Sequence, residues 1–255
     1  MWDQLAAVDW EYGELSARVY QLDKPVGKSL GGDIEFYRAA LAGIDGPVLE
    51  PAVGTGRMLI PLLRDGVDVT GYDTSPHMLQ VCRQNLAAAG VTAEVFRADM
   101  TTHRDPDRYA AVLIPTGSII LLPDRDTVRA ALAAARDSLT AGGRLYVDVP
   151  AFDPTTAGPM RHWWDGEHEL LTLQIMHVDV DRVRQRVVSW QRYELWRDGR
   201  LVDTQLQRGA MQWFGLPEFT GLLRDAGFDD IEVVGDHGDA VPDSDSSIWT
   251  FVATK

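Results

Sequence analysis

Residues 48–63 read VLEPAVGTGRMLIPLL: a short apolar run, the acidic residue Glu50, the glycines Gly54 and Gly56, and then apolar residues at helical spacing. In an open α/β sheet such a turn follows the first strand, and ligands bind beyond the carboxyl ends of the strands. A dinucleotide site would carry a third glycine where Leu59 stands, and Glu50 would repel a phosphate at short range. The stretch therefore predicts a strand, a ligand-binding turn and a helix, with a ligand whose amino-acid moiety is positively charged.

Apolar strands alternate with helices along most of the chain after this turn. Strands separated by helices of this length form βαβ units, which build a parallel sheet with helices on both faces. The expected strands cover residues 48–50, 67–72, 93–96, 110–114, 144–149, 230–234 and 247–253, and the expected helices cover 56–65, 75–89, 124–139 and 216–226. The sequence thus predicts an α/β fold with a doubly wound, Rossmann-like, mostly parallel seven-stranded sheet.

A different pattern follows the fifth strand. Residues 169–180, 184–196 and 200–214 alternate apolar and polar side chains, and Arg197-Asp198-Gly199 has the composition of a hairpin turn. These segments predict three antiparallel strands inserted before the main sheet resumes. The insertion is rich in tryptophan, so it can be a sheet packed on the core, a dimer face or one wall of a substrate pocket.

The charge and the cysteine content exclude several classes of protein. With 24 Lys and Arg against 38 Asp and Glu, the net charge is −14, which disfavours nucleic acid and anionic membranes as partners. The single cysteine, Cys82, cannot form an internal disulfide. The sequence shows neither a basic stretch leading into an N-terminal apolar region nor an apolar run of about 18 residues. We therefore expect a cytoplasmic protein.

The chain resembles the class I S-adenosylmethionine-dependent methyltransferases, most strongly over residues 48–149. In that family the turn reads acidic-x-Gly-x-Gly-x-Gly, and here it stands as Glu50-Pro51-Ala52-Val53-Gly54-Thr55-Gly56. The resemblance implies that Glu50 holds the ammonium group of S-adenosylmethionine, through water or the loop backbone. It also implies that Ala52, Gly54 and Gly56 admit the methionine and ribose. Arg57 can pair with a carboxylate of the cofactor or substrate, or be a solvated first-turn residue.

Two further acidic residues stand at the ends of successive strands. Asp73, in VTGYDTSPHML (69–79), can accept hydrogen bonds from two vicinal ribose hydroxyls. Asp99, in FRADM (96–100), matches the family position whose carboxylate accepts from the adenine amino group, with Met100 against the ring. Either residue alone would be typical of a helix cap. The predicted cofactor-binding set is Tyr20, Glu50, Ala52, Gly54, Gly56, Arg57, Asp73, Thr74, Met78, Asp99, Met100, Pro115 and Thr116.

The fourth strand runs into a polar turn in AVLIPTGSIILLPD (111–124). The resemblance places this turn, Pro115 to Ser118, beside the transferred methyl group and the entering acceptor. A capped βα loop would have the same composition. The predicted substrate-binding set is Tyr12, Ser118, Ile120, Phe152, Trp163 and Trp164.

Methyl transfer requires collinear positioning of nucleophile, methyl and sulfur more than it requires acid or base groups, because the cofactor is already activated. An amine acceptor needs little more, whereas a hydroxyl acceptor would call for a base or a metal ion. We see no metal-binding cluster in the sequence. His162, just past the fifth strand, is the candidate base, although a histidine in such a loop is more often a surface or packing residue.

The N-terminal stretch WEYGELSARVYQLD (10–23) is similar to a segment of small-molecule N-methyltransferases that tailor amino sugars and related antibiotic precursors. In those enzymes a helix and a loop close over cofactor and substrate. Tyr12 and Tyr20 would share one face of an unbroken helix, where both can be packing residues. The similarity implies that the Tyr20 hydroxyl binds the cofactor carboxylate or orients an amine. Gln21 departs from the pattern, and residues 24–33 are expected to open to admit ligand.

The combined prediction is a methyltransferase of small molecules, with an amine acceptor preferred and a role in antibiotic biosynthesis. Its expected parts are an N-terminal helical cap (1–46), a cofactor-binding core (47–152), an antiparallel insertion (153–214) serving as substrate lid or homo-oligomer face, and a C-terminal segment completing the sheet (215–255). The alternatives are an O-methyltransferase with His162 as base, a non-catalytic cofactor-binding module, and a nicotinamide oxidoreductase.

Overall fold

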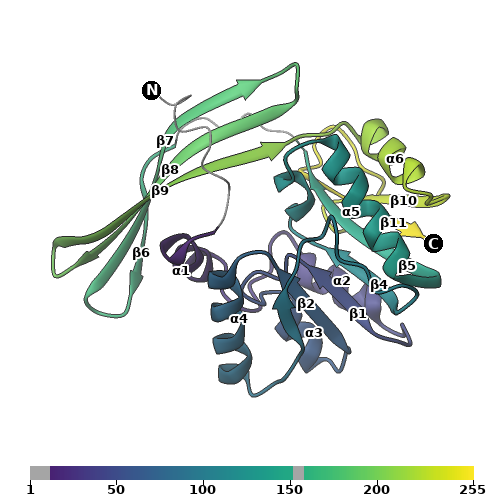
Figure 1. Ribbon diagram of the computed structural model, residues 1–255, viewed down its shortest axis with the longest axis horizontal. Helices are drawn as coiled ribbons and strands as arrows, with labels where there is room; N and C mark the ends of the chain where they lie inside the picture. The colour runs from purple at the N-terminus through teal and green to yellow at the C-terminus, as the bar shows by residue number, and fades with distance from the viewer. Residues whose placement is uncertain (1–11, 152–157) are drawn as a thin grey trace.

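A mostly parallel sheet of seven strands forms the centre of the computed structural model, which describes residues 12–151 and 158–255 (Figure 1). Its strands are β1 (Val48–Pro51), β2 (Val69–Asp73), β3 (Val95–Arg97), β4 (Tyr109–Ile114), β5 (Leu139–Pro150), β10 (Asp230–Gly235) and β11 (Ile248–Thr254). Their order is β10-β11-β5-β4-β1-β2-β3, with β11 antiparallel to β5 and β10. The order reverses at β1, and ligands of open α/β sheets bind beyond the carboxyl ends at such a point. The predicted fold class is confirmed.

Helices cover both faces of the sheet, because successive strand residues point to opposite sides. On β4, Ala111 and Leu113 face one helical layer, whereas Val112 and Ile114 face the other, and none of the four is more than 1% exposed. The first layer is α2 (Asp33–Leu41), α3 (Leu59–Arg64) and α4 (Pro76–Ala89), and the second is α5 (Arg125–Ser138) and α6 (Leu216–Asp225). Each fully buried Val, Leu or Ile contributes about 1.5–3 kcal/mol, so these two apolar layers stabilise the sheet.

Local sequence explains where the helices begin. The Ser75 hydroxyl accepts the Met78 N–H (3.2 Å), so α4 starts where the sequence predicts. The helix expected over 56–65 is shorter: Gly56 is left-handed (φ 81°), and α3 begins only at Leu59. The fifth strand is longer than expected and begins at Leu139.

A second sheet, of four antiparallel strands, follows β5. Its strands are β6 (Arg161–Asp165), β7 (Glu169–Asp181), β8 (Arg186–Arg197) and β9 (Arg200–Gln212). The β8–β9 hairpin turns at Asp198 (φ 49°) and Gly199 (φ 74°), as predicted. The expectation of three strands is wrong, because β6 pairs along β7. Its sequence, RHWWD, is short and places two tryptophans side by side, so it shows no strand periodicity.

Helix α1 (Glu14–Asp23) lies between the two sheets (Figure 1). Its Leu15 and Val19 pack on Leu171 and Tyr193 of the second sheet. Arg18 forms ion pairs with one carboxylate on β6 and one on β7, both at 2.6 Å. The second sheet is therefore joined to the N-terminal segment as well as to β5, and α1 stands over the carboxyl edge of the main sheet.

The connection from α1 to α2 is a loop, as the sequence predicts. Tyr12 precedes α1, so the expectation of one unbroken helix through Tyr12 and Tyr20 is wrong. The division of the chain into four functional parts remains a prediction. None of the helices within the described ranges combines the length and apolar composition needed to cross a membrane.

Candidate functional site

The turn after β1 is built from left-handed residues. Ala52 (φ 54°), Gly54 (φ 56°) and Gly56 (φ 81°) all have positive φ. A Cβ on Gly56 would lie 3.0 Å from the sulfur of Cys82, so a side chain there would be crowded as well as strained by the positive φ. A Cβ on Gly54 would meet nothing closer than 3.9 Å, because this part of the turn borders an open cavity. Ala52 holds a conformation that costs a non-glycine residue roughly 1–2 kcal/mol, which explains why the family carries glycine here.

Glu50 is buried directly beneath this turn, with 2% of its surface exposed. Its Oε2 atom has no hydrogen-bond partner. Burial raises the pKa of Glu50 to about 8, with smaller contributions from the charges of Asp33 and Asp73 and despite the opposing charge of Arg57. A cation near this carboxyl group would favour its ionised form and interact with Oε2, which lacks a partner. The resemblance assigns this role to the ammonium group of S-adenosylmethionine.

Asp73 connects the turn to the end of β2. Its two oxygens accept the N–H groups of Gly54 (3.0 Å) and Ser75 (2.8 Å). One strand further, Asp99 Oδ1 accepts both the N–H (2.8 Å) and the hydroxyl (2.7 Å) of Thr101. These contacts hold both side chains in place, and because a carboxylate has about four lone-pair sites, Asp99 retains acceptor capacity for a ligand.

A cavity of about 550 Å³ lies along these strand ends. Eight predicted cofactor residues line it: Tyr20, Ala52, Gly54, Asp73, Thr74, Met78, Asp99 and Met100. The other predicted cofactor residues do not line it: four are buried, namely Glu50, Gly56, Arg57 and Pro115, and Thr116 lines a neighbouring cavity. The structure therefore brings the predicted nucleoside-binding residues together in one cavity.

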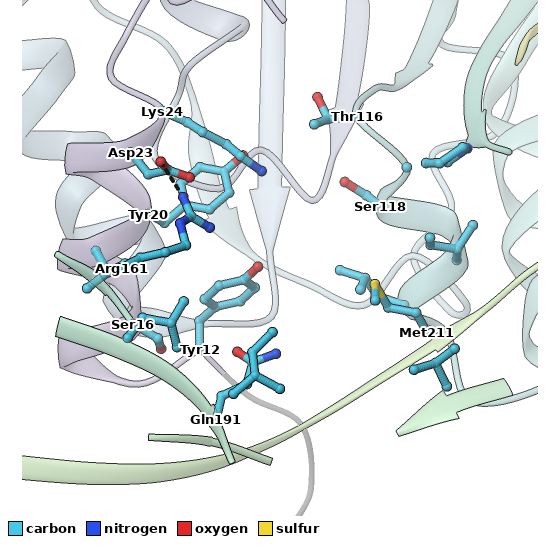
Figure 2. Close-up of a pocket in the computed structure, with 18 of the residues that line it drawn as sticks. Tyr12, Ser16, Tyr20, Asp23, Lys24, Thr116, Ser118, Arg161, Gln191 and Met211 are labelled. Atoms are coloured by element: carbon cyan, nitrogen blue, oxygen red, sulfur yellow. Dashed lines mark hydrogen bonds and ion pairs between the residues drawn. The ribbon is translucent and has the colours of Figure 1, made fainter. Parts of the chain in front are cut away.

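The neighbouring cavity, of about 540 Å³, lies between α1, the turn after β4 and the second sheet (Figure 2). Four residues line both cavities: Tyr12, Tyr20, Ser118 and Leu121. The rings of Tyr12 and Tyr20 meet edge to face, with centroids 5.9 Å apart. Burial raises the pKa of both tyrosines, so both phenols are neutral hydrogen-bonding groups at the boundary between the cavities.

The predicted substrate residues differ in where the structure places them. Ser118 and Ile120 line the second cavity, as Tyr12 does, whereas Trp163 packs against α1 and Trp164 is 61% exposed. His162 is exposed, and because Arg161 next to it lines the cavity, His162 projects from the opposite face of β6. Phe152 lies outside the described residues.

Several cavity residues were not predicted from the sequence. They are Asp23, Lys24, Pro150, Arg161, Gln191, Tyr193, Met211 and Trp213. Four of the eight, Arg161, Gln191, Tyr193 and Met211, come from strands of the second sheet. Within the described ranges, no group of three or more His, Cys, Asp and Glu side chains is arranged to hold a metal ion.

Arg57 has a structural role in the turn after β1. Its guanidinium, with 4% of the side chain exposed, forms an ion pair with buried Asp33. It also donates to the carbonyl of Lys28 (2.7 Å) and to the hydroxyl of Thr116 (2.6 Å). Its burial corrects the expectation of a solvated first-turn residue, whereas pairing of Arg57 with a ligand carboxylate remains a prediction. It ties the loop before α2 to the turns after β1 and β4.

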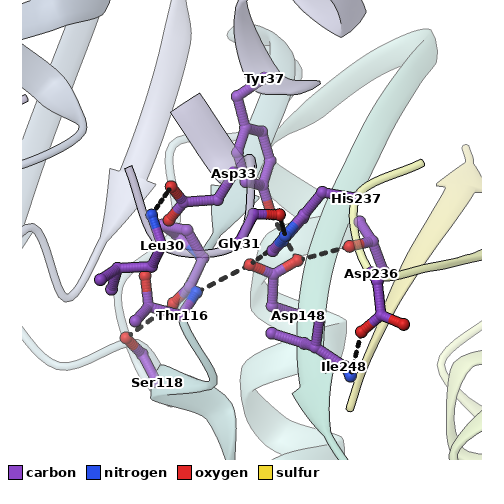
Figure 3. Close-up of polar contacts among 12 residues, drawn as sticks. Leu30, Gly31, Asp33, Tyr37, Thr116, Ser118, Asp148, Asp236, His237 and Ile248 are labelled. Atoms are coloured by element: carbon purple, nitrogen blue, oxygen red, sulfur yellow. Dashed lines mark hydrogen bonds and ion pairs between the residues drawn. The ribbon is translucent and has the colours of Figure 1, made fainter. Parts of the chain in front are cut away.

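Asp148 and His237 form a second buried contact behind the turn after β4 (Figure 3). Thr116 is left-handed (φ 60°), and its N–H donates to Asp148 Oδ2 (2.8 Å). Asp148, which is fully buried, also accepts from the hydroxyls of Tyr37 (2.9 Å) and Thr250 (2.7 Å). The His237 Nε2 atom lies 3.2 Å from the same carboxylate. Asp148 thereby holds Thr116 in its strained conformation beside the second cavity.

His237 is the imidazole partner of Asp148. Burial alone would lower the pKa of His237, but the hydrogen bond and charge of Asp148 outweigh it and raise that pKa. The second ring nitrogen, Nδ1, lies 3.4 Å from the carbonyl oxygen of Gly31. The sequence gives one signal for this pair, a carboxylate within the apolar strand LYVDVP (145–150), and none for His237.

Comparison with known proteins agrees with this geometry. Residues 48–143 match the family model described as a methyltransferase domain. Together with the similar proteins described next, this match identifies the chain as an S-adenosylmethionine-dependent methyltransferase. A protein of Geobacillus sp. (strain WCH70), named a putative methyltransferase, is 24% identical over 219 residues, covering 82% of this chain and 84% of its own length. Of the alternatives, this match argues against the nicotinamide oxidoreductase.

Solved structures share the whole fold. An S-adenosylmethionine-dependent methyltransferase from Clostridium acetobutylicum superposes with a TM-score of 0.75 at 13% identity, over 93% of this chain and 96% of that chain. The sugar N-methyltransferase KedS8 from Streptoalloteichus sp. gives 0.73 at 21% identity, over 96% and 94%. The methyltransferase CcbJ from Streptomyces caelestis gives 0.71 at 20% identity, over 95% and 98%. At these identities the likeness establishes the fold.

The first cavity fits S-adenosylmethionine. The carboxylates of Asp73 and Asp99, which line this cavity, suit a ribose and an exocyclic amine. Glu50 is buried next to the cavity and does not line it, so its unpartnered Oε2 would act on an ammonium group through water or the loop backbone. When bound, S-adenosylmethionine supplies a methyl group on a positively charged sulfur. The neutral phenols of Tyr12 and Tyr20 place no competing nucleophilic anion beside that group, because their raised pKa values keep them protonated.

Asp73→Ala is expected to weaken binding of S-adenosylmethionine by about 10–100-fold. The substitution removes a charged acceptor and also releases the Gly54 N–H that fixes the turn, and a hydrogen bond to a charged group is worth about 1.5–3 kcal/mol. Titration calorimetry with S-adenosylmethionine and S-adenosylhomocysteine measures the loss. Asp68→Ala, at an exposed aspartate just before β2, is the control. Unchanged affinity in Asp73→Ala would remove Asp73 from the cofactor site.

Proposed function

We propose that the enzyme methylates an amine nitrogen of a small polar molecule, of the amino-sugar type, in the biosynthesis of an antibiotic or a related secondary metabolite. The observation that carries the proposal is the boundary between the two cavities. It presents the hydroxyls of Tyr12, Tyr20 and Ser118, and no imidazole of the described residues lines the second cavity. Such a boundary can orient an amine lone pair but offers no imidazole base to activate a hydroxyl.

The names of structurally similar proteins support the same class of acceptor. KedS8 is a sugar N-methyltransferase, and CalS10 of Micromonospora echinaspora is an amino pentose methyltransferase. The TM-score to CalS10 is 0.66 at 21% identity.

In the proposed reaction the chain's main tasks are orientation and exclusion of water. Tyr12 and Tyr20 hold the acceptor nitrogen in line with the methyl group, and Ser118 and Leu121 complete the narrow passage between the cavities. The nitrogen lone pair forms the new N–C bond, the C–S bond breaks, and its electron pair neutralises the sulfonium. The product ammonium then loses its proton to solvent. We further propose that the second sheet acts as the wall of the substrate pocket and that the loop at residues 24–33 opens for ligand entry.

His162→Ala is expected to retain activity within about twofold, because His162 projects away from the cavity. The assay incubates the enzyme with S-adenosylmethionine and matched pairs of amino sugars and the corresponding hydroxy sugars, and mass spectrometry locates the added methyl group. We expect N-methylated products alone. O-methylated product together with a loss of about 100-fold or more in His162→Ala would instead establish the O-methyltransferase with His162 as base.

A further inference from the structure

The charged side chains of the second cavity are gathered on one wall. Asp23 and Lys24 end α1, and Arg161 begins β6 beside them (Figure 2). The opposite wall consists of Thr116, Gly117 and Ser118 with apolar neighbours, and it carries no charged side chain. An acceptor molecule in this cavity therefore has a charged side and an uncharged side.

Lys24 is a partly buried cation whose ammonium contacts no carboxylate among the described residues. That ammonium lies 5.0 Å from the ring centroid of Tyr20. Burial lowers the pKa of Lys24, and the charges of Arg57, Arg161 and Lys28 lower it further against the opposing effect of Asp23. A bound anion would contact this ammonium directly.

Arg161 is fixed in place next to Lys24. Its guanidinium forms an ion pair with Asp23 at 2.6 Å and stacks over the ring of Trp163 at 4.7 Å. A guanidinium has five N–H donors in a planar fork, and Asp23 accepts from one of its terminal nitrogens. Asp23 therefore orients Arg161, and the three side chains together carry one net positive charge.

We propose that Lys24 and Arg161 form a binding site for an anionic group, a carboxylate or a phosphate, on the same acceptor molecule whose amine is methylated. This inference rests on the proposed function, since it adds a second recognition element to that acceptor. Tyr20, which borders the cofactor cavity, lies directly beneath the Lys24 ammonium. In a chain of net charge −14, such a positive wall discriminates in favour of acceptors that carry both charges.

The test compares three probes that share one amino sugar skeleton. Glucosamine is neutral apart from its amine, glucosamine 6-phosphate adds a phosphate, and 2-amino-2-deoxyglucuronic acid adds a carboxylate. Calorimetric titration of each into enzyme saturated with S-adenosylhomocysteine gives its affinity. We expect at least one anionic probe to bind about 10-fold or more tightly than glucosamine, and the tighter of the two identifies the group. Equal affinity for all three, or no binding by either anionic probe, overturns the proposal.

Three variants assign the effect to Lys24. Lys24→Met should abolish the preference for the anionic probe, whereas Lys24→Arg should keep it, because the positive charge remains. Lys28→Met is the matched control, since the Lys28 ammonium is exposed and donates to the carbonyl of Asp23. If Lys24→Met weakens S-adenosylhomocysteine binding by the same factor, Lys24 belongs to the cofactor site and the proposal fails. A preference that survives in Lys24→Met also overturns it.

The experiment separates this inference from the proposed function. If an anionic probe binds in a Lys24-dependent manner but no amine in the panel is methylated, the anion site is supported and the proposal of N-methylation is rejected. Methylation of neutral and anionic amines with equal KM would keep N-methylation and reject the anion site.

Discussion

Glu50→Gln is expected to weaken binding of S-adenosylmethionine by about 10–100-fold and, at the same time, to stabilise the ligand-free protein at pH 8 and above. Loss of a charged hydrogen-bond partner costs about 1.5–3 kcal/mol, which sets the change in affinity. The gain in stability arises because burial raises the pKa of Glu50 to about 8. Its ionised form is unfavourable in the folded ligand-free state, and glutamine cannot ionise.

The sign of the pH dependence follows from the same shift. A carboxyl group whose pKa is higher in the folded state contributes stability that is fully present below its unfolded pKa of about 4.3. That contribution is lost as the pH rises through the folded pKa of about 8. Urea unfolding of the ligand-free protein from pH 5 to 9 should show this decline in wild type and a flatter profile in Glu50→Gln. Glu232→Gln, at an exposed residue of β10, is the control.

Cofactor binding should also release a proton from Glu50. An ammonium placed beside Glu50 lowers the pKa of the carboxyl group, so the proton held at pH 7 leaves on binding. Calorimetry in buffers of different ionisation enthalpy measures the number of protons released. A wild-type value near zero, or one that Glu50→Gln does not change, would contradict the role assigned to Glu50.

The sequence predicts the first cavity, along the strand ends, better than the second cavity, where we propose that the acceptor binds. The reason is physical, and the two are called the cofactor cavity and the acceptor cavity below. Asp73 and Asp99 directly follow strands, and the carboxyl ends of parallel strands meet at one edge of the sheet. Their mutual proximity thus follows from local pattern and fold class alone. The acceptor cavity depends on the pairing of β6 and on the position of α1 between the sheets. Neither is encoded in local periodicity.

The residues that the sequence missed are joined by long-range contacts. Asp148 and His237 are far apart in the chain and meet only because β11 returns beside β5. Because Arg57 follows the glycine turn, the sequence allows a solvated side chain there. In the structure its guanidinium instead donates to the Asp33 carboxylate and the Thr116 hydroxyl. The sequence pattern places His162 in a loop, where it is a candidate base. In the structure it lies on strand β6, and the alternation of side chains along that strand points it away from the second cavity.

Asp148→Asn is expected to lower stability by about 3–5 kcal/mol and to reduce kcat more than it weakens cofactor binding. Asn offers a single acceptor oxygen, so the change breaks the buried contact with His237 and leaves some of the donors of Tyr37, Thr116 and Thr250 without their partner, which sets the loss of stability. Asp148 also fixes Thr116, which lines the acceptor cavity and not the cofactor cavity. The turn that positions the acceptor should therefore relax while the adenosyl site remains intact. Denaturant unfolding, cofactor calorimetry and steady-state kinetics measure the three effects.

The pH dependence of stability separates this pair from Glu50. Asp148 raises the pKa of His237, so the pair contributes stability that is fully present below the unfolded pKa of histidine, about 6.5. That contribution is lost as the pH rises through the folded pKa of His237. Asp33, Tyr37 and Asp236 are the other titratable groups near this ring. None of them is changed in the comparison of wild type with His237→Gln.

His237→Gln should therefore flatten the decline in stability above about pH 6.5. Glutamine can still donate a hydrogen bond to Asp148, so this variant should remain folded even if Asp148→Asn is too unstable to assay. His168→Gln, at an exposed histidine in the β6–β7 turn, should leave the profile unchanged. If His237→Gln keeps the wild-type pH profile, His237 is neutral in the folded state. Asp148 would then hold the Thr116 turn as an unpaired carboxylate supported by Tyr37, Thr250 and the Thr116 N–H alone.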